Sequence, residues 1–162
     1  MLRSIFILAS AISNLTVASG VPLDVSKIVD QAAAESVFDG KAKTAAPVNV
    51  QGGDGYYSKC IYYSETPGKT LLLRVYQAAE GYDAGRELES VKKNTPALKE
   101  VSGLGDKALV TDWKESALPP RSMMLYVLKG NILITIGLGG FGDETASLGK
   151  ARSVAEKILA QL

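Results

Sequence analysis

The sequence predicts an α+β fold, in which a mostly antiparallel sheet is covered by helices, one of them near each end of the domain. Apolar residues recur at helical spacing in three segments, and the segments between them show the alternation and the turn residues of strands. The strands follow one another in uninterrupted runs joined by short turns, which makes neighbouring strands antiparallel. A chain of 162 residues, 46% of them hydrophobic and 22% charged, is typical of one globular domain.

Residues 1–20 have the pattern of a secretory signal peptide. Arg3 supplies the positive start, residues 5–12 form a short apolar run, and small side chains at 18–20 offer a cleavage site. The alternative, a membrane anchor, needs a longer run to cross about 30 Å of hydrocarbon. We therefore expect one mature domain at 21–162 that is secreted or periplasmic and has no membrane contact after cleavage.

The first half of the domain predicts one helix and a three-stranded meander. The helix is expected over Asp24–Val37, because Asp24 can cap it, apolar residues recur at helical spacing, and Gly40 can end it. The pairs Asp54-Gly55 and Pro67-Gly68 favour tight turns between the strands that follow. These strands are expected at residues 46–50, 56–64 and 70–78.

The second half predicts a helix, further strands and a closing helix. The period becomes helical over Tyr82–Asn94, with Ala84, Leu88 and Val91 on the inner face, and Pro96 stops this helix. A short strand at 98–101, a longer one at 107–113 and a hairpin over 121–138 with its turn at Lys129–Ile132 are expected next. The closing helix is expected over Asp143–Leu162, with its inner stripe at Leu148, Ala151, Ala155, Ile158 and Leu162.

Three glycines near the end of the chain have the G-x-G-x-x-G spacing of a dinucleotide-binding turn. Gly137, Gly139 and Gly142 also follow an apolar strand, as such a turn requires. However, only the twenty residues 143–162 remain, and their pattern is that of one helix, so no second parallel strand can complete a βαβ unit. We therefore expect a turn into the last helix and no nucleotide cofactor.

The residue types available exclude several kinds of catalytic site. The sequence has no histidine, which excludes Ser-His-Asp and Cys-His catalysis and most zinc or copper sites. Cys60, the single cysteine, lies in an apolar strand pattern and is expected to be buried and inert. Carboxylates are scattered among bases, although Asp83 and Glu87 stand at helical spacing and a carboxylate pair can serve glycoside hydrolysis. We expect no catalytic residue, no metal and no cofactor.

The charge balance argues against nucleic acid as a partner. Removal of residues 1–20 takes away Arg3 and no acid, so 18 basic residues become 17 against 17 acidic ones. A neutral domain without runs of like charge lacks the basic surface that phosphate backbones and anionic membranes attract.

Aromatic side chains are the remaining candidates for a ligand or partner contact. Trp113 ends a predicted strand beside the proline-containing loop 114–120, which would place it at the mouth of the sheet. Tyr76 and Tyr63 belong to the meander, and strand alternation places Tyr63 on the face opposite Cys60. The sequence therefore predicts ligand or partner contacts by Trp113, Tyr76 and Tyr63.

Four segments carry a resemblance to a known family: "KCIYY" (59–63), "VSGLGDKA" (101–108), "LYVLKGNILITIGL" (125–138) and "ARSVAEKILAQL" (151–162). Their order resembles that of PsbP-like domains, including small exported bacterial domains that are often lipoproteins. The resemblance implies an α/β/α sandwich and a non-enzymatic accessory or binding role, and it transfers no catalytic residue. The chain departs from the pattern because it lacks a lipid-anchor cysteine and has no second cysteine for the disulfide that some relatives carry.

Three functional hypotheses follow from the sequence. The first is an exported, soluble, non-enzymatic binding or accessory domain for an unknown small ligand or protein partner. The second is a small carboxylate-dependent hydrolase that acts on an extracellular polymer. The third is a structural protein that forms a homodimer through an exposed sheet edge or through Cys60, so that both a monomer and a homodimer remain open.

Overall fold

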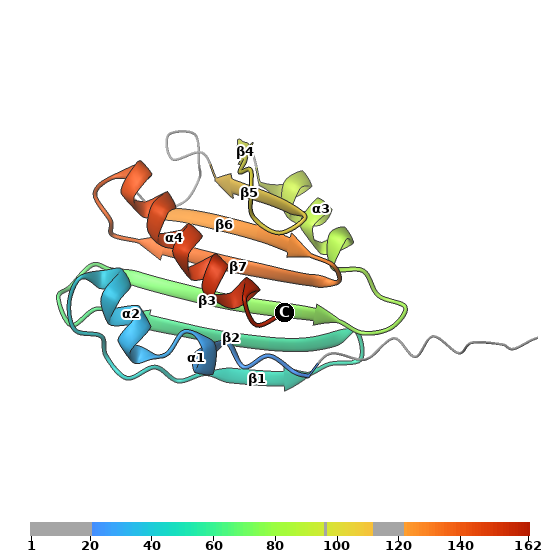
Figure 1. The fold of residues 1–162 in the computed structure, drawn as a ribbon, viewed down its shortest axis with the longest axis horizontal. Coiled ribbons are helices and arrows are strands. Elements are labelled where there is room, and N and C mark those ends of the chain that lie inside the picture. Colours follow the sequence, from blue (N-terminus) through green and yellow to red (C-terminus); the bar gives the residue numbers. More distant parts are fainter. Residues whose placement is uncertain (1–20, 96, 112–121) are drawn as a thin grey trace, which may run out of the picture.

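The computed structural model describes residues 21–95, 97–111 and 122–162, and it confirms the predicted α+β class. Among these residues the strands form one seven-stranded sheet, in the order β1-β2-β3-β7-β6-β5-β4, and every neighbouring pair is antiparallel (Figure 1). The helices are α1 (Val25–Ile28), α2 (Gln31–Phe38), α3 (Ala84–Asn94) and α4 (Glu144–Leu159). The strands are β1 (Val48–Gln51), β2 (Gly55–Tyr63), β3 (Thr70–Ala78), β4 (Leu98–Glu100), β5 (Lys107–Thr111), β6 (Ser122–Lys129) and β7 (Ile132–Gly139).

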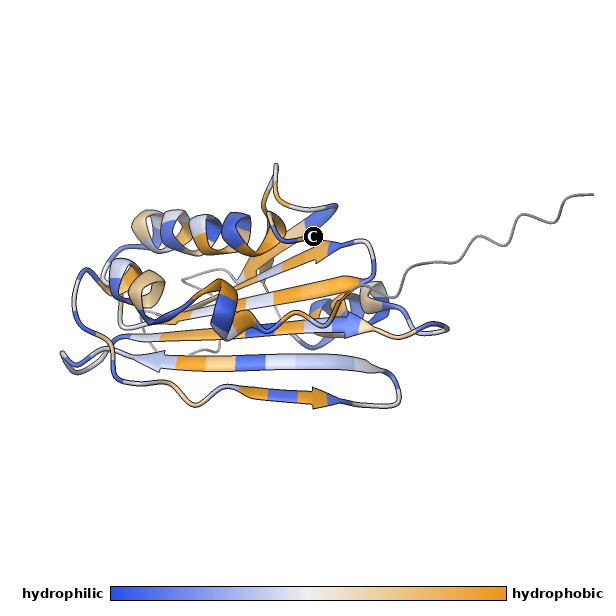
Figure 2. Ribbon diagram, turned by 60° about the horizontal axis from the view of Figure 1, so that its bottom comes forward, coloured by the Kyte–Doolittle hydropathy of each residue, from blue (hydrophilic) through white to orange (hydrophobic). Residues whose placement is uncertain are grey.

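Helices lie on both faces of the sheet. Alternate residues of β3 point to opposite sides, so Leu73 joins the larger core under α1, α2 and α4, whereas Tyr76 joins a smaller core with Leu88 of α3. Figure 2 shows the apolar residues concentrated in the strands and hydrophilic residues on the outer turns of α4. The result is a three-layer arrangement in which α3 covers its face only in part: the side chains of Val48, Val50 and Tyr63 on that face are about half exposed.

The first helix is not continuous, and the expectation of one helix over Asp24–Val37 is wrong. The chain leaves helical geometry at Val29, and Asp30 caps a second helix by accepting a hydrogen bond from the N–H of Ala33 (2.9 Å). The hydroxyl of Tyr62 donates to the carbonyl of Val29 (2.8 Å) in the core, which satisfies a group that the helix would otherwise use. The break therefore depends on a partner from β2.

The closing helix is also shorter than expected, because it ends at Leu159. Ala151, Ala155 and Ile158 of the predicted stripe are buried, but Leu162 lies beyond the helix and is 48% exposed. A helix end with nothing packed beyond it frays readily, and Leu162 has no core position to occupy. The end of the strand expected at 107–113, and Trp113 with it, lies outside the described residues.

The glycine motif has a structural role in the sheet. Strand β7 is antiparallel to both of its neighbours, so it is not part of a parallel βαβ unit. A Cβ on Gly137 would meet the Sδ atom of Met124 (2.8 Å) and the Cβ atom of Leu72 (3.2 Å), so glycine leaves the space that these two side chains use. Gly140 turns the chain toward α4 with a φ of 80°, a conformation that glycine adopts at little cost.

Candidate binding groove

The structure does not bring the three predicted contact residues together. Tyr76 is 6% exposed and packs under α3, whereas Tyr63 is 51% exposed. The two tyrosines share a face of the sheet, but Tyr63 pairs with Thr70 and Tyr76 pairs with Tyr57, six residues further along the strands and about 20 Å away. Trp113 lies outside the described residues. Contacts from Tyr76 or Tyr63 to a partner remain a prediction.

Tyr57 and Tyr76 form a structural cross-strand pair. Their rings stack with centroids 4.7 Å apart, and the Arg74 guanidinium lies 5.6 Å from the ring centre of Tyr57. The Tyr57 hydroxyl donates to the carboxylate of Asp54, and this hydrogen bond raises the pKa of Tyr57. The Tyr76 hydroxyl donates to the Asp54 carbonyl (3.0 Å). Both tyrosine hydroxyls are thus used within the fold.

Carboxylates of the described residues serve mainly as caps and ion-pair partners. Lys107 holds the pKa of Glu89 below its usual range through a hydrogen bond (2.8 Å). The N–H of Gly130 and then Lys129 do the same for the pKa of Asp106. A general acid needs a raised pKa, so these shifts have the wrong sign for that role. The residues that cap helices are Asp24, Asp30, Asp83 and Asp143.

Cys60 is confirmed as a buried residue, with 1% of its surface exposed. Its removal from water raises the pKa of the thiol, which lowers the population of the nucleophilic thiolate. Within the described parts of the chain, no cluster of three or more cysteine or acidic side chains is placed to hold a metal ion.

A candidate binding site is a groove between α2 and α4 of about 330 Å³, near the lower end of the range for small-ligand sites. Its floor is apolar and its rim is polar. The floor is formed by Val29, Ala33, Val37 and Val154, and the rim by Ser36, Lys150, Ser153 and Lys157.

Small side chains on α2 create this groove. Ala33 and Ser36 face α4, so the two helices do not fill the space between them as larger residues would. On α4 the groove is lined at intervals of three and four residues, by Lys150, Ser153 and Lys157, which places these side chains in one row along the helix.

The two groove lysines differ in their partners. The Lys150 ammonium lies 3.0 Å from the carboxylate of Asp39, the residue that ends α2, and this pair holds the pKa of Asp39 below its usual range. Lys157 is exposed and makes no ion pair with another described residue. Of the two groove lysines, Lys157 is therefore the one without an ion-pair partner among the described residues.

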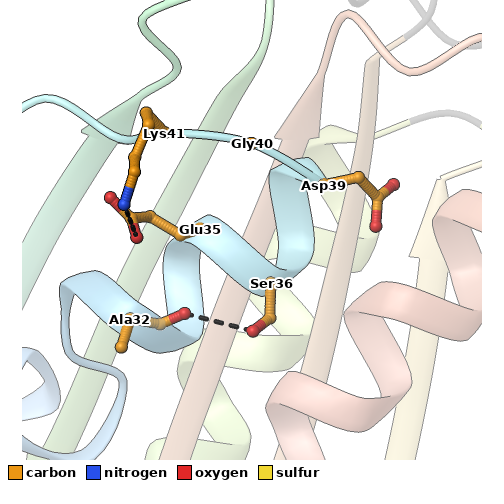
Figure 3. Close-up of a pocket in the computed structure, with 6 residues that line it drawn as sticks. All are labelled: Ala32, Glu35, Ser36, Asp39, Gly40 and Lys41. Carbon is orange, nitrogen blue, oxygen red and sulfur yellow. Dashed lines mark hydrogen bonds and ion pairs between the residues drawn. The ribbon is translucent and has the colours of Figure 1, made fainter.

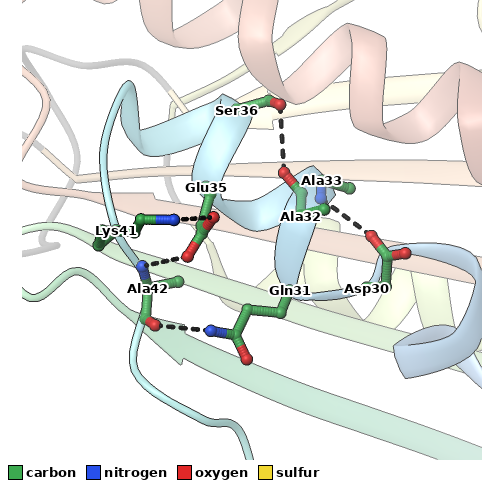
Figure 4. A network of polar contacts seen from close by, with 8 residues as sticks. All are labelled: Asp30, Gln31, Ala32, Ala33, Glu35, Ser36, Lys41 and Ala42. Atoms are coloured by element: carbon green, nitrogen blue, oxygen red, sulfur yellow. Dashed lines mark hydrogen bonds and ion pairs between the residues drawn. The ribbon is translucent and has the colours of Figure 1, made fainter.

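A second, wider hollow of about 570 Å³ adjoins the groove and shares Ser36 with it (Figure 3). In Figure 3, Glu35 and Lys41 face one another (3.2 Å), and Asp39 points away from them. Glu35 also accepts from the N–H of Ala42 (3.3 Å), which with Lys41 holds the pKa of this carboxyl low (Figure 4). These bonds tie the chain after α2 back to the helix, so we assign this hollow a structural role.

Sequence reasoning missed the groove. The row of polar residues on α4 was visible as its outer face, but the facing residues on α2 are more than 100 positions earlier in the chain. No local pattern connects the two helices, because their positions are set by the sheet beneath them.

No known protein family matches the chain, and none of the curated proteins matches it. No helix in the described ranges is long and apolar enough to cross a membrane. The likeness to PsbP-like domains therefore rests on the sequence segments alone.

Proposed function

We propose that this chain is an exported, non-enzymatic binding domain and that its ligand occupies the α2–α4 groove. The signal-like pattern of residues 1–20 supports the export part of this proposal. The observation that carries the binding role is the groove itself, which joins an apolar floor to Lys157, a cation without an ion-pair partner among the described residues. An apolar cleft with a few polar groups is the usual form of a small-ligand site.

Binding is favoured over hydrolysis by the chemistry of the groove. Its lining contains no carboxylate, cysteine or tyrosine, and the hydroxyl of Ser153 donates to the carbonyl of Gly149 instead of to a base that could activate it as a nucleophile. Asp83 and Glu87, the pair considered for glycoside hydrolysis, lie on α3 across the sheet, where Asp83 caps the helix and Glu87 lies 3.8 Å from Arg74. Turnover in a broad hydrolase screen that is lost on changing one acidic residue would contradict the proposal.

Filling the groove is expected to abolish ligand binding. Ser153→Phe places a ring over the apolar floor, so affinity for the neutral apolar dye N-phenyl-1-naphthylamine should fall by at least about tenfold in a fluorescence titration. Ser90→Phe is the matched control, because Ser90 is an exposed helical serine on α3 and lies on the other face of the sheet. Urea unfolding of both variants shows whether they fold. Equal dye binding by the two folded variants would exclude the groove as the site.

A homodimer through β1 is the second candidate function, and a specific observation favours it. Strand β1 is an edge of the sheet, carries no charge, and exposes Val48 (55%) and Val50 (50%). Edge strands usually carry charges or prolines that prevent pairing with another chain. The opposite edge, β4, follows this rule with Lys99 and Glu100, whereas β1 has only Pro47 immediately before it.

The hydrogen-bond register defines how two β1 strands would meet. Gly52 and Gly55 form a hydrogen-bonded pair, because the N–H of Gly52 donates to the carbonyl of Gly55 (2.8 Å). Main-chain groups alternate in direction along a strand, so those of Val50 point toward β2, whereas those of Asn49 and Gln51 point toward the free edge. In an antiparallel pair of β1 strands, Asn49 of each copy can then exchange two main-chain hydrogen bonds with Gln51 of the other copy. This register places Val50 next to the Val50 of the second copy, at the two-fold axis.

A cysteine on the two-fold axis is expected to cross-link the dimer. Val50→Cys should form a disulfide-linked dimer on mild oxidation, because directly opposed Cβ atoms lie about 4.5–5.5 Å apart. Val48→Cys, on the same face but away from the axis, should give much less. Non-reducing electrophoresis compares the two, while Cys60 stays buried in both. Equal cross-linking, or a monomer by sedimentation at every concentration tested, would contradict this dimer.

A further inference from the structure

We infer that the ligand of the α2–α4 groove is a single-chain amphiphile with one negative charge, whose anionic head lies at Lys157 and whose apolar tail lies along Val37 and Val154. This inference rests on the proposed binding function and specifies the chemical class of the ligand. The charge of the groove, the direction of the apolar floor and the state of the rim hydroxyls each support it.

The net charge of the groove suits one anion. Two lysines line it and no carboxylate does. Asp39 lies outside the lining but pairs with Lys150 at 3.0 Å, and the Lys150 side chain is only 26% exposed. Of the two lysines in the lining, this leaves Lys157 without an ion-pair partner among the described residues. A dianion such as a phosphate monoester would exceed this charge, and a cation would meet repulsion.

The groove also has a direction. The ion pair of Asp39 with Lys150 places the end of α2 beside Lys150. Lys157 is seven positions after Lys150, which is about 10 Å along the helix. The charged end of the groove is thus at Lys157, and an apolar floor with Val37 (8% exposed) and Val154 (5% exposed) extends from it toward the compensated end. This gradient matches a ligand with one polar end.

The rim hydroxyls argue against a sugar-like ligand. Ser36 donates to the carbonyl of Ala32 (3.1 Å), and Ser153 donates to the carbonyl of Gly149 (3.1 Å). Each hydroxyl has one proton, which is thereby used within its own helix. A carbohydrate needs several directed donors and acceptors, and each of its hydroxyls left without a partner would lower affinity. An alkyl chain needs none.

The test uses decanoate as the anionic probe and decyltrimethylammonium as its cationic counterpart. Each displaces N-phenyl-1-naphthylamine from the full chain, and competition titrations give the two affinities. We expect decanoate to bind about two- to fivefold more tightly than the cation, since an exposed charge pair contributes up to about 1 kcal/mol. Lys157→Gln should reduce the affinity for decanoate about two- to fivefold more than it reduces the affinity for the neutral dye.

Two further variants make the result decisive. Lys93→Gln, an exposed lysine of α3 on the other face, should leave both affinities unchanged. Asp39→Asn releases Lys150 at the other end of the groove, about 10 Å from the proposed head, and should change the affinity for decanoate less than about twofold; asparagine also tolerates the left-handed backbone at this position (φ 54°). If Lys157→Gln leaves decanoate binding unchanged, or Asp39→Asn raises it severalfold, the assignment of the anionic head to Lys157 is overturned while the groove remains a dye site. If the dye binds to folded Ser153→Phe as tightly as to the unaltered protein, the proposed function itself fails.

Discussion

Gly140→Ala is expected to destabilise the fold by about 3–5 kcal/mol. Gly140 has a φ of 80°, which costs an L-residue strain energy, and a Cβ at this position would overlap the carbonyl oxygen of Gly68. Because that oxygen belongs to the main chain, no side-chain rotation can relieve the overlap. Urea unfolding followed by circular dichroism measures the change in the free energy of unfolding.

Gly142→Ala is the matched control for this substitution. Gly142 is two residues away in the same connection and is exposed, and a Cβ added to it would lie in open space, with no atom beyond its chain neighbours within 4 Å. Its replacement should leave the stability unchanged or raise it by up to about 1 kcal/mol, because alanine restricts the unfolded chain. A similar loss for both variants would mean that the connection before α4 does not approach Gly68 as described. A small loss for Gly140→Ala would have the same meaning.

Leu73→Ala is expected to cost about 2–5 kcal/mol, the second of the two largest effects. Leu73 lies in the middle of β3, is 0% exposed, and belongs to the core between the sheet and α1, α2 and α4. Truncation removes apolar contacts and leaves a cavity that neighbouring strands on both sides of β3 cannot close. The same urea titration provides the measurement.

Leu72→Ala tests which face of the sheet carries this core. Leu72 is the preceding residue of the same strand, points to the opposite face and is only half-buried. Its truncation should cost less than half as much as that of Leu73, because it already contacts water and leaves no closed cavity. Equal losses of stability would show that the α3 face of the sheet is covered as completely as the face that carries α1, α2 and α4.

The stability tests change buried residues, whereas the binding tests change exposed ones. On the face of the sheet that carries α1, α2 and α4, the central strands β3 and β7 are buried and support α4. The groove lies on the outer side of that layer, where changes such as Ser153→Phe or Lys157→Gln alter exposed side chains. Binding variants are therefore expected to remain folded, which separates tests of function from tests of stability.

The candidate site is less predictable from sequence than the fold. A tyrosine such as Tyr76 suggests a ligand contact because it has an apolar ring and a polar tip, but in the structure its ring stacks on Tyr57 and its hydroxyl bonds to the main chain. The groove residues Ser36 and Ser153 give no signal of their own, because an exposed helical serine is ordinary wherever it occurs. Their role in the candidate site comes only from lining the same groove, one from α2 and one from α4.

The sequence by itself determined the α+β class, the succession of strands along the chain and their antiparallel pairing, the buried state of Cys60 and the exclusion of histidine chemistry. These properties depend on composition, on periodicities of a few residues and on turn residues at fixed positions. Only the tertiary structure decided that the first helix breaks at Val29, where Tyr62 supplies the replacement hydrogen bond, and that α2 and α4 enclose a groove. Both features join residues far apart in the chain, and such contacts are set by the packing of helices on a common sheet, which local patterns do not encode.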